Sequence, residues 1–378
     1  MDMEKNKSLK KVSIITIIDN VNFGTYLQAL ALAKTIENLH FSPHIIDYCR
    51  KHQSFNYLLH SNIASTYNPL KWIYRTYNWY KSMQLRKKDK IFLKKYLTKK
   101  EYYSFNELAQ NPPQADIYVT GSDQVWNSSY NKGIDKSFYL DFAPKQKPRI
   151  SYASSIGMEY IPEHEKQTII ELLSKYQAIS VREKKAEQLL NELNLPIKPT
   201  TVLDPTLLLT KEDWQNYACK RLIHEPYAVV YSVETKTQDK LISKMAGIIS
   251  RNKGLKIAGI YYGGKKSKIE NTDYDFFRVT PSVFLSLFYY ADYCIVSSFH
   301  GTAFSVNFQK DFLTITPKKF NSRVDNLLTL CNLKERLVIN EEYDTQNALE
   351  SIDYTLVNHH IEKARQHSIA YLKQALLS

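Results

Sequence analysis

The repeated alternation of short β-branched runs with helical periodicity limits this chain to few folds. In the first half, strand-like runs occupy residues 12–18, 44–49, 116–120, 150–154 and 178–181, and helical patterns occupy 26–39, 163–176 and 183–193. In the second half, strand-like runs occupy 227–233, 256–262, 293–297 and 312–316, and helical patterns occupy 238–249, 281–290 and 301–308. Successive parallel strands need long crossover connections, which are usually helices. The alternation therefore predicts an α/β fold with parallel sheets covered by helices on both faces.

The pattern stops and restarts at a proline-rich stretch, residues 195–205, which indicates a domain junction. A chain of 378 residues is also longer than one hydrophobic core usually serves. We expect two Rossmann-like domains, at residues 1–205 and 206–353, with parallel sheets that face a cleft. A basic helical insertion is expected at about 51–110, and a C-terminal helix within 354–378 should pack back on the first domain.

The cysteines and the apolar segments predict a cytoplasmic protein. The four cysteines contain no Cys-x-x-Cys pair, which favours reduced, buried thiols over a zinc knuckle or a redox dithiol. The apolar run near the N-terminus, residues 12–19, is too short for a signal peptide, and no run reaches the ~18–20 residues that cross a bilayer. No metal ligand set is evident, because His359 and His360 are expected on an exposed helical face.

The positive charge is concentrated in one segment. The formal net charge is +13, and residues 51–100 hold twelve Lys or Arg against one acid, Asp89. Aromatic residues, among them Tyr74, Tyr77 and Trp79, lie between these charges. A solvated helical face, contact with an anionic membrane and nucleic-acid binding are three interpretations. We expect peripheral contact with the inner face of a membrane as the main alternative to the solvated face, and no nucleic-acid partner, because no recognition motif accompanies the charge.

Ligands of open parallel sheets bind beyond the carboxyl ends of the strands, and two polar loops lie there in the first half. Residues 19–24 include Asn22 and Gly24, and the glycine can bring backbone close to a ligand, although a purely structural turn is equally open. The loop lacks G-x-G-x-x-G, so no dinucleotide cofactor is expected. Residues 121–127 include Ser122, Asp123 and Trp126, which would suit sugar hydroxyls and a sugar ring face. A local turn with a core tryptophan is the alternative.

The sharpest motif is residues 297–302, Ser-Ser-Phe-His-Gly-Thr, between a strand-like run and a helical pattern. His300 at a helix N-terminus would combine an anion site with an acid–base group. Arg182, directly after a strand-like run, could grip a carboxylate or phosphate with two hydrogen bonds or form a local salt bridge. Asp204 could be a base or a turn residue, and Arg323 could be a ligand-binding or a surface residue.

Taken together, these motifs resemble the polysaccharide pyruvyl transferase family. The matching segments are Asn22-Phe23-Gly24 with Leu27-Gln28-Ala29-Leu30, Gly121 to Trp126, Ser180 to Glu183, Asp204-Pro205 and Ser298 to Ser305. The resemblance implies a fold like the GT-B glycosyltransferases. It also implies transfer of a pyruvyl group from phosphoenolpyruvate onto two hydroxyls of one sugar, giving a cyclic ketal and phosphate in bacterial exopolysaccharide or capsule synthesis.

The resemblance, with one departure, assigns roles to these residues. Many family members carry Arg two positions before the histidine, where this chain has Ser298, and we expect Arg323 to replace it. The expected catalytic residues are His300 and Arg182. The expected site residues are, for the phosphoenolpyruvate donor, Arg182, Ser298, His300, Gly301, Thr302 and Arg323, and, for the acceptor, Asn22, Gly24, Ser122, Asp123 and Trp126, with Asp204 as a further candidate.

The expected partners are phosphoenolpyruvate and a saccharide acceptor. Phosphoenolpyruvate serves as co-substrate with no further cofactor, and the saccharide acceptor is expected to be lipid-linked because of the basic segment. Two rival functions stay open, since fold does not settle chemistry. One is a nucleotide-sugar-dependent glycosyltransferase of GT-B type, and the other is a non-catalytic saccharide-binding protein.

Overall fold

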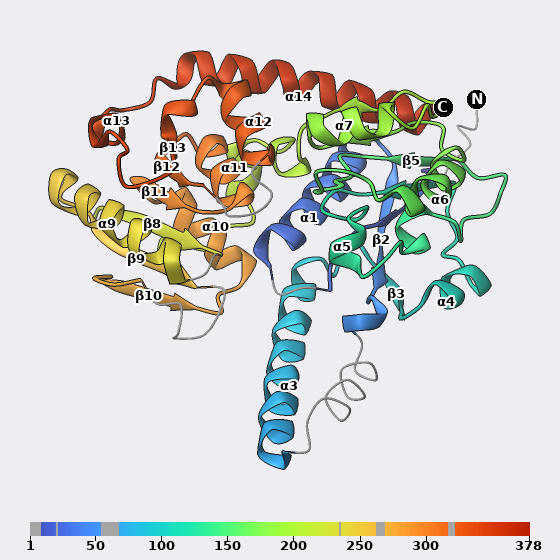
Figure 1. Cartoon of the computed structure of the whole chain (residues 1–378), viewed down its shortest axis with the longest axis horizontal. Helices are drawn as coiled ribbons and strands as arrows, with labels where there is room; N and C mark the ends of the chain where they lie inside the picture. Colours follow the sequence, from blue (N-terminus) through green and yellow to red (C-terminus); the bar gives the residue numbers. More distant parts are fainter. Residues whose placement is uncertain (1–8, 20–21, 54–67, 234–235, 262–268, 317–321) are drawn as a thin grey trace, which may run out of the picture. The chain divides into compact units, whose positions relative to one another are not determined.

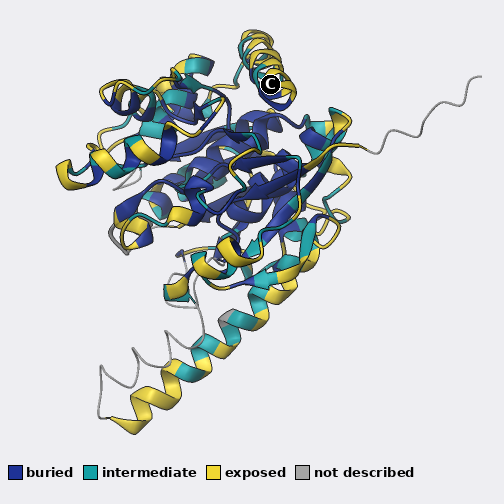
Figure 2. Ribbon diagram, turned by 90° about the vertical axis from the view of Figure 1, so that its right-hand side faces the viewer, coloured by how far each residue is buried: buried dark blue, intermediate teal, exposed yellow. Residues whose placement is uncertain are grey.

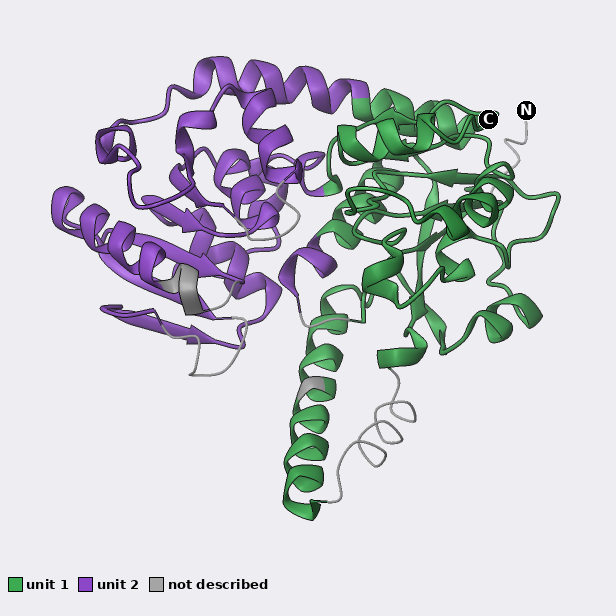
Figure 3. Ribbon diagram, viewed as in Figure 1, with its two compact units in different colours: residues 1–20, 28–205, 368–378 green, residues 21–27, 206–367 purple. Residues whose placement is uncertain are grey.

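A computed structural model describes residues 9–19, 22–53, 68–233, 236–261, 269–316 and 322–378 (Figure 1). The described residues form two compact units. Unit 1 comprises those within 1–20, 28–205 and 368–378, and unit 2 comprises those within 21–27 and 206–367 (Figure 3). Both the first helix, α1 (Phe23–Asn38), and the last helix, α14 (Tyr354–Leu377), contribute residues to both units.

Unit 1 is built on a five-stranded parallel sheet with the order β3-β2-β1-β4-β5. β1 is buried from its second residue onward, as expected for a strand covered on both faces. A separate two-stranded parallel sheet joins β6 to β7. The strands of unit 1 are β1 (Lys11–Ile15), β2 (Ser42–Tyr48), β3 (Leu97–Tyr102), β4 (Ile117–Thr120), β5 (Arg149–Ser151), β6 (Ser180–Val181) and β7 (Thr200–Thr201).

The helices of unit 1 connect these strands and cover the sheet. Besides α1 they are η1 (Lys51–Gln53), α3 (Pro69–Phe92), α4 (Phe105–Gln110), α5 (Ser128–Asn131), η2 (Lys136–Tyr139), α6 (Glu163–Leu173) and α7 (Lys184–Asn191). The basic insertion predicted at about 51–110 contains α3, a helix of 24 residues that protrudes from the rest of unit 1 (Figure 2). Asn68 caps α3, because its side chain accepts hydrogen bonds from two backbone N–H groups of the first turn, and Pro69 stands at the first helical position.

Unit 2 is built on a six-stranded parallel sheet with the order β10-β9-β8-β11-β12-β13. Counted along the chain this order is 3-2-1-4-5-6, the Rossmann arrangement. Its strands are β8 (Tyr227–Ser232), β9 (Lys256–Tyr261), β10 (Tyr274–Phe277), β11 (Tyr293–Val296), β12 (Asp311–Ile315) and β13 (Leu337–Val338). The helices are η3 (Pro205–Leu207), α8 (Lys211–Gln215), α9 (Lys236–Lys253), α10 (Pro281–Tyr289), α11 (Phe299–Asn307), α12 (Ser322–Cys331), η5 (Lys334–Arg336) and α13 (Thr345–Leu349).

The structure confirms the predicted α/β class with two Rossmann-like parallel sheets, and adds strands that the pattern did not indicate. β3 and β10 lie at the edges of their sheets and lack the β-branched runs of central strands, because β3 reads Leu-Thr-Lys-Lys-Glu-Tyr and β10 reads Tyr-Asp-Phe-Phe. The predicted helix at the C-terminus is α14. In unit 1, the Ser368 hydroxyl of this helix accepts a hydrogen bond from the backbone N–H of Leu203. Among the described residues, no helix is long and apolar enough to span a membrane.

Candidate functional site

The Ser-Phe-His-Gly-Thr motif forms the first turn of α11, directly after β11. Ser298 is the N-cap of this helix, and its hydroxyl accepts a 3.0 Å hydrogen bond from the backbone N–H of Gly301. The Thr302 hydroxyl donates to the Ser298 carbonyl at 3.0 Å and lies 3.0 Å from the Thr314 hydroxyl of β12. A Cβ on Gly301 would lie 2.8 Å from Cβ of Val296, so the glycine lets the helix start close to the strand. The motif thus fixes where His300 stands.

His300 packs against the start of α1, and both belong to unit 2. A Cβ added to Gly24 would lie 2.0 Å from Nδ1 and 2.3 Å from Cγ of His300, so no other residue fits there without moving the whole ring. The Asn22 side chain accepts a hydrogen bond from the backbone N–H of Gly24 at 3.0 Å. The Phe23 ring stacks on Phe284 of α10 with centroids 4.8 Å apart. Two motifs that lie about 275 residues apart in the sequence therefore meet at the imidazole.

Arg323 at the start of α12 lies next to this turn. Its guanidinium carbon is 5.8 Å from the centroid of the Phe299 ring, which makes an edge contact with the His300 ring at 5.3 Å. The N-terminus of α11 carries partial positive charge from its backbone N–H groups. A guanidinium, an imidazole and a helix N-terminus are thus gathered in unit 2, as anion binding requires. Phe299, which links Arg323 to His300, was not among the predicted site residues, and nothing in a lone aromatic position would have indicated its role.

Arg182 forms a buried charge cluster in unit 1. Its Nη1 lies 2.7 Å from Oδ2 of Asp204 and 3.4 Å from the Ser122 hydroxyl. Asp123 and Glu183 follow at 3.8 and 4.0 Å. The Arg182 side chain is 1% exposed and that of Asp204 is 0% exposed. Burial disfavours the charged guanidinium, but the attraction of Asp204, Asp123 and Glu183 outweighs burial and raises the pKa of Arg182.

This environment differs from the expectation of a guanidinium that grips the donor. Arg182 is surrounded by carboxylates of its own unit. These carboxylates neutralise the positive charge of the guanidinium, which would otherwise attract a phosphate or carboxylate ligand. An ion pair describes the observed contacts better, but its main partner is Asp204 at 2.7 Å, and the local partner Glu183 is more distant at 4.0 Å. Glu183 is itself held by hydrogen bonds from the Ser155 hydroxyl and from two backbone N–H groups. We therefore interpret Arg182 and Asp204 as residues that position the loop at Ser122.

Trp126 lies in the core of unit 1. It is 3% exposed, and its ring stacks on Tyr139 with centroids 5.7 Å apart. The indole N–H donates to the carbonyl of Phe138 at 3.1 Å. Because its faces are covered by protein, this indole does not offer a platform for a sugar ring, and the core alternative fits the geometry. Ser122 is fully buried too, whereas Asp123 keeps a side chain that is 14% exposed at a backbone φ of +77°.

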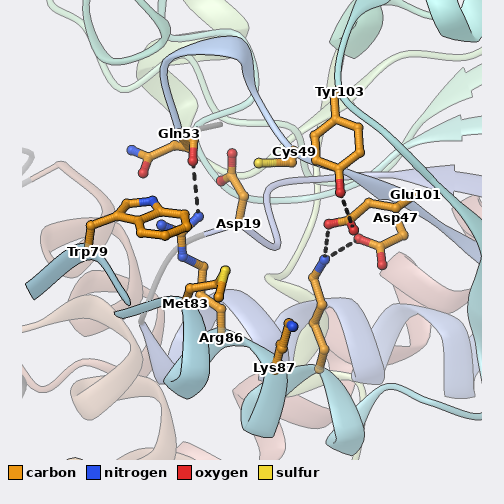
Figure 4. Close-up of a pocket in the computed structure, with 11 residues that line it drawn as sticks. Asp19, Asp47, Cys49, Gln53, Trp79, Met83, Arg86, Lys87, Glu101 and Tyr103 are labelled. Carbon is orange, nitrogen blue, oxygen red and sulfur yellow. Dashed lines mark hydrogen bonds and ion pairs between the residues drawn. The ribbon is translucent and has the colours of Figure 1, made fainter. Parts of the chain in front are cut away.

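A pocket that the sequence did not indicate lies elsewhere in unit 1. Its volume is about 330 Å³, and it lies where α3 meets the carboxyl ends of β2 and β3 (Figure 4). Asp19, in the loop after β1, also lines it and accepts a bidentate pair from Arg50, with the closest distance 2.7 Å. The signal that could have revealed this pocket is Asp47 near the end of a predicted strand, but its partner strand β3 was not expected.

Metal ligation has no evident place in the described ranges. No group of three or more His, Cys, Asp or Glu side chains is arranged there to hold a metal ion. The four cysteines are free thiols, and burial raises the pKa of Cys49, Cys294 and Cys331 to about 12. These thiols therefore stay protonated at neutral pH and are poor nucleophiles and metal ligands.

Comparison with known proteins agrees with the fold and the motifs. Residues 22–319 match the polysaccharide pyruvyl transferase family, a span that contains every predicted site residue except Arg323. A comparison with curated proteins finds no match. Among solved structures, S. aureus MnaA with UDP is similar at a TM-score of 0.52 and 11% identity, covering 97% of each chain.

Two further structures are similar at lower TM-scores. UDP-GlcNAc 2-epimerase from Neisseria meningitidis bound to UDP-GlcNAc has 9% identity and a TM-score of 0.47, covering 98% of this chain and 100% of that one. Anabaena Alr3699/HepE in complex with UDP-glucose has 7% identity and a TM-score of 0.46, covering 97% and 98%. The likeness to enzymes of the GT-B fold concerns the fold alone, because these identities are low.

Proposed function

This chain belongs to the polysaccharide pyruvyl transferase family, and from that premise we propose that it transfers a pyruvyl group from phosphoenolpyruvate to a saccharide as a cyclic ketal. The observation that carries the proposal is the contact of His300 with Gly24 beside the first turn of α11. This contact joins the two motifs on which the family resemblance rests most. The same turn has Arg323 next to it, which supports binding of an anionic donor there.

The donor site is proposed on the N-terminus of α11. Phosphoenolpyruvate carries about three negative charges, so its site needs cations and backbone donors. Arg323 and the first-turn N–H groups supply both, and Ser298 and Thr302 hold that turn in place through their hydrogen bonds. The guanidinium that many family members carry two positions before the histidine is thereby replaced by one from α12.

His300 is proposed to move the protons of the reaction. A proton delivered to the methylene carbon of phosphoenolpyruvate makes it a methyl group and leaves an oxocarbenium-like centre at the neighbouring carbon. One sugar hydroxyl adds to that centre and loses its proton, the bond to phosphate breaks, and the second hydroxyl closes the ketal. Of the two hydroxyl protons, one replaces the proton donated to carbon and the other leaves with phosphate. His300 serves first as acid and then as base.

We place this reaction in the cytoplasm, where phosphoenolpyruvate is made, at the inner face of a membrane that carries a lipid-linked acceptor. The support comes from α3, whose outer half is largely exposed (Figure 2) and carries large apolar side chains among basic ones. The exposed apolar side chains there are Leu70, Trp72, Ile73, Tyr74, Tyr77 and Tyr80, and the basic residues near them are Lys71, Arg75 and Lys81. Sedimentation with vesicles of anionic lipid, but not of neutral lipid, is expected. Equal sedimentation with both would remove the membrane from the proposal.

Phosphate release from phosphoenolpyruvate, with mass spectrometry of the product, tests the reaction. A panel of galactose-, glucose-, mannose- and N-acetylhexosamine-containing acceptors is used, both as nucleotide sugars and as lipid-linked saccharides. We expect acceptor-dependent release and a mass gain of about 70 Da, the mass of a pyruvyl ketal. No release with any acceptor, together with thermal stabilisation by a nucleotide sugar alone, would instead support a glycosyltransferase. Binding of an acceptor without any turnover would support a saccharide-binding protein.

A further inference from the structure

None of the site residues predicted from the sequence lines the pocket under α3. Its volume of about 330 Å³ falls within the ~300–1,000 Å³ typical of ligand pockets. It lies at the carboxyl ends of β2 and β3, the edge at which open parallel sheets bind ligands. One wall is a face of α3, and the other is formed by these strands and the segments that follow them, including η1 (Figure 4).

The carboxylates that line this pocket already have cationic partners within unit 1. Asp19 accepts hydrogen bonds from the Arg50 guanidinium, the closest at 2.7 Å, and from the Arg50 backbone N–H at 2.9 Å. Lys90 Nζ lies 2.6 Å from Oδ1 of Asp47 and 2.7 Å from Oε1 of Glu101. The negative charges are therefore held by the protein itself and do not await a cationic ligand.

Two further cations of α3 line the pocket, Arg86 and Lys87, and among the described residues neither forms an ion pair with a carboxylate. Arg86 Nη1 donates one long hydrogen bond, of 3.5 Å, to the carbonyl of Gln53 (Figure 4). Burial raises the pKa of Cys49, which also lines the pocket, to about 12, so its thiol adds no negative charge. With Arg50 counted, four cations stand against three carboxylates, and the surplus positive charge lies on α3.

This pair of cations matches a phosphate ester. A guanidinium can bind two oxygens of one phosphate, and an ammonium group adds a second positive charge without a fixed geometry. Arg86 is partly buried and Lys87 is exposed, so the pair extends from the interior of the pocket to its mouth. An ester can therefore place its phosphate oxygens on the pair while the group that it carries remains outside.

We propose that Arg86 and Lys87 bind a phosphate or diphosphate ester in this pocket. Resting on the proposed function, the ester belongs to the acceptor, because the donor is assigned to the N-terminus of α11 in unit 2. An ester of this kind links a saccharide to a lipid or to a nucleotide, and both carriers offer the same anionic group. The pocket thus favours a carrier-linked acceptor over a finished polymer.

Calorimetric titration tests the site without turnover. The probes are geranyl diphosphate, UDP and inorganic pyrophosphate, which share the diphosphate group and differ in what it carries. We expect at least one of the two esters to bind, and Arg86→Gln with Lys87→Gln to weaken this binding about tenfold or more, because two charged donors are lost. Glutamine is a good helix former, so α3 retains its helical structure. The ester that responds identifies the carrier as lipid or nucleotide.

A second double variant controls for the loss of charge. Lys88→Gln with Lys94→Gln removes two exposed cations, in and directly after α3, that do not line the pocket, and should change the affinity less than about twofold because exposed charges are screened. Lys87→Gln alone, at an exposed position, should weaken ester binding about threefold and keeps the test available if the first double variant is unstable. No binding of either ester, equal losses in the two double variants, or a response of inorganic pyrophosphate alone would overturn the proposal.

Vesicle sedimentation distinguishes the ester from the surface of a membrane. Vesicles of anionic phospholipid should lose binding equally with the two double variants, because attraction to such a surface depends on the number of charges. A larger loss for the pair Arg86 and Lys87 than for Lys88 and Lys94 would assign the pocket pair to phospholipid headgroups and overturn the proposal.

Kinetics separates this proposal from the proposed function. In Arg86→Gln with Lys87→Gln, the KM of a lipid- or nucleotide-linked acceptor should rise about tenfold, while the KM of the methyl glycoside of the same sugar and that of phosphoenolpyruvate stay unchanged. An unchanged KM for the carrier-linked acceptor would overturn the pocket while the transferase activity stands. Ester binding that depends on the pair, in a protein that never releases phosphate, would retain the pocket and overturn the pyruvyl transfer.

Discussion

The motif around Arg182, after β6 of the two-stranded sheet of unit 1, and the motif around His300, after β11 of the six-stranded sheet of unit 2, have opposite surroundings. Each follows a buried parallel strand at its carboxyl end. The Arg182 guanidinium is closed in by Asp204, Asp123 and Glu183, so its charge is used inside the protein. At His300, the nearby groups are a glycine, an aromatic ring and backbone N–H groups, and the local charge is positive.

A charged motif residue at a strand end can therefore serve one of two purposes. A buried ion network fixes a loop, and its removal should be measured in stability. A positively charged helix N-terminus with an imidazole attracts an anion, and its removal should be measured in turnover. The four predictions that follow assign each residue to one of these purposes.

The largest effect is expected for His300→Asn. Loss of the proton-transferring group should lower kcat about 10²- to 10⁴-fold, while the free energy of unfolding falls only modestly, because asparagine loses the packing of one ring but introduces no clash beside Gly24. Single-turnover phosphate release and urea unfolding measure the two quantities. Near-native turnover would exclude His300 from catalysis and make its contact with Gly24 purely structural.

Arg182→Ala should mainly destabilise the fold. It leaves the carboxylate of Asp204 buried without its ion partner, which costs about 3–5 kcal/mol. Urea unfolding measures the loss, and the double variant Arg182→Met with Asp204→Leu serves as control, because removing both charges should recover much of the stability. A normal free energy of unfolding with a raised phosphoenolpyruvate KM would return Arg182 to the donor site.

Gly24→Ala should moderately lower both kcat and the free energy of unfolding. The added methyl group would overlap the His300 ring, so the ring must move, at a cost of about 1–3 kcal/mol and a clear loss of kcat. Gly247→Ala is the matched control, because Gly247 lies inside α9 with only Arg251 nearby, and alanine there should stabilise the helix by about 1 kcal/mol. Equal behaviour of the two variants would contradict the close approach of Gly24 to His300.

The smallest effect is expected for Ser298→Ala. Loss of the N-cap hydrogen bond to Gly301 should cost about 1 kcal/mol of stability. Ser298→Asn retains a capping side chain and should behave like the unmodified protein. If alanine instead raises the phosphoenolpyruvate KM several-fold at unchanged stability, Ser298 contacts the donor directly rather than through the helix turn.

Much of the fold could be predicted because central parallel strands are apolar throughout and helices are periodic. The runs that became β8 and β11 stand out for this reason, and the bounds of α14 agree with the prediction. The edge strand β3 was missed, because it reads Leu-Thr-Lys-Lys-Glu-Tyr and has no apolar alternation. The pocket under α3 was missed with it, since the pocket depends on Glu101 of that strand.

The α/β class, the family motifs and the order in which polar residues follow the strands are all evident from the amino-acid sequence. Local pattern is enough for these, because strand and helix periodicity and turn chemistry act over a few residues. What each motif residue touches could be learned only from the folded chain: Gly24 meets His300, Arg182 is enclosed by carboxylates, and Trp126 is buried. Long-range packing sets burial and pairing, and these properties separate a ligand-binding charge from a structural one.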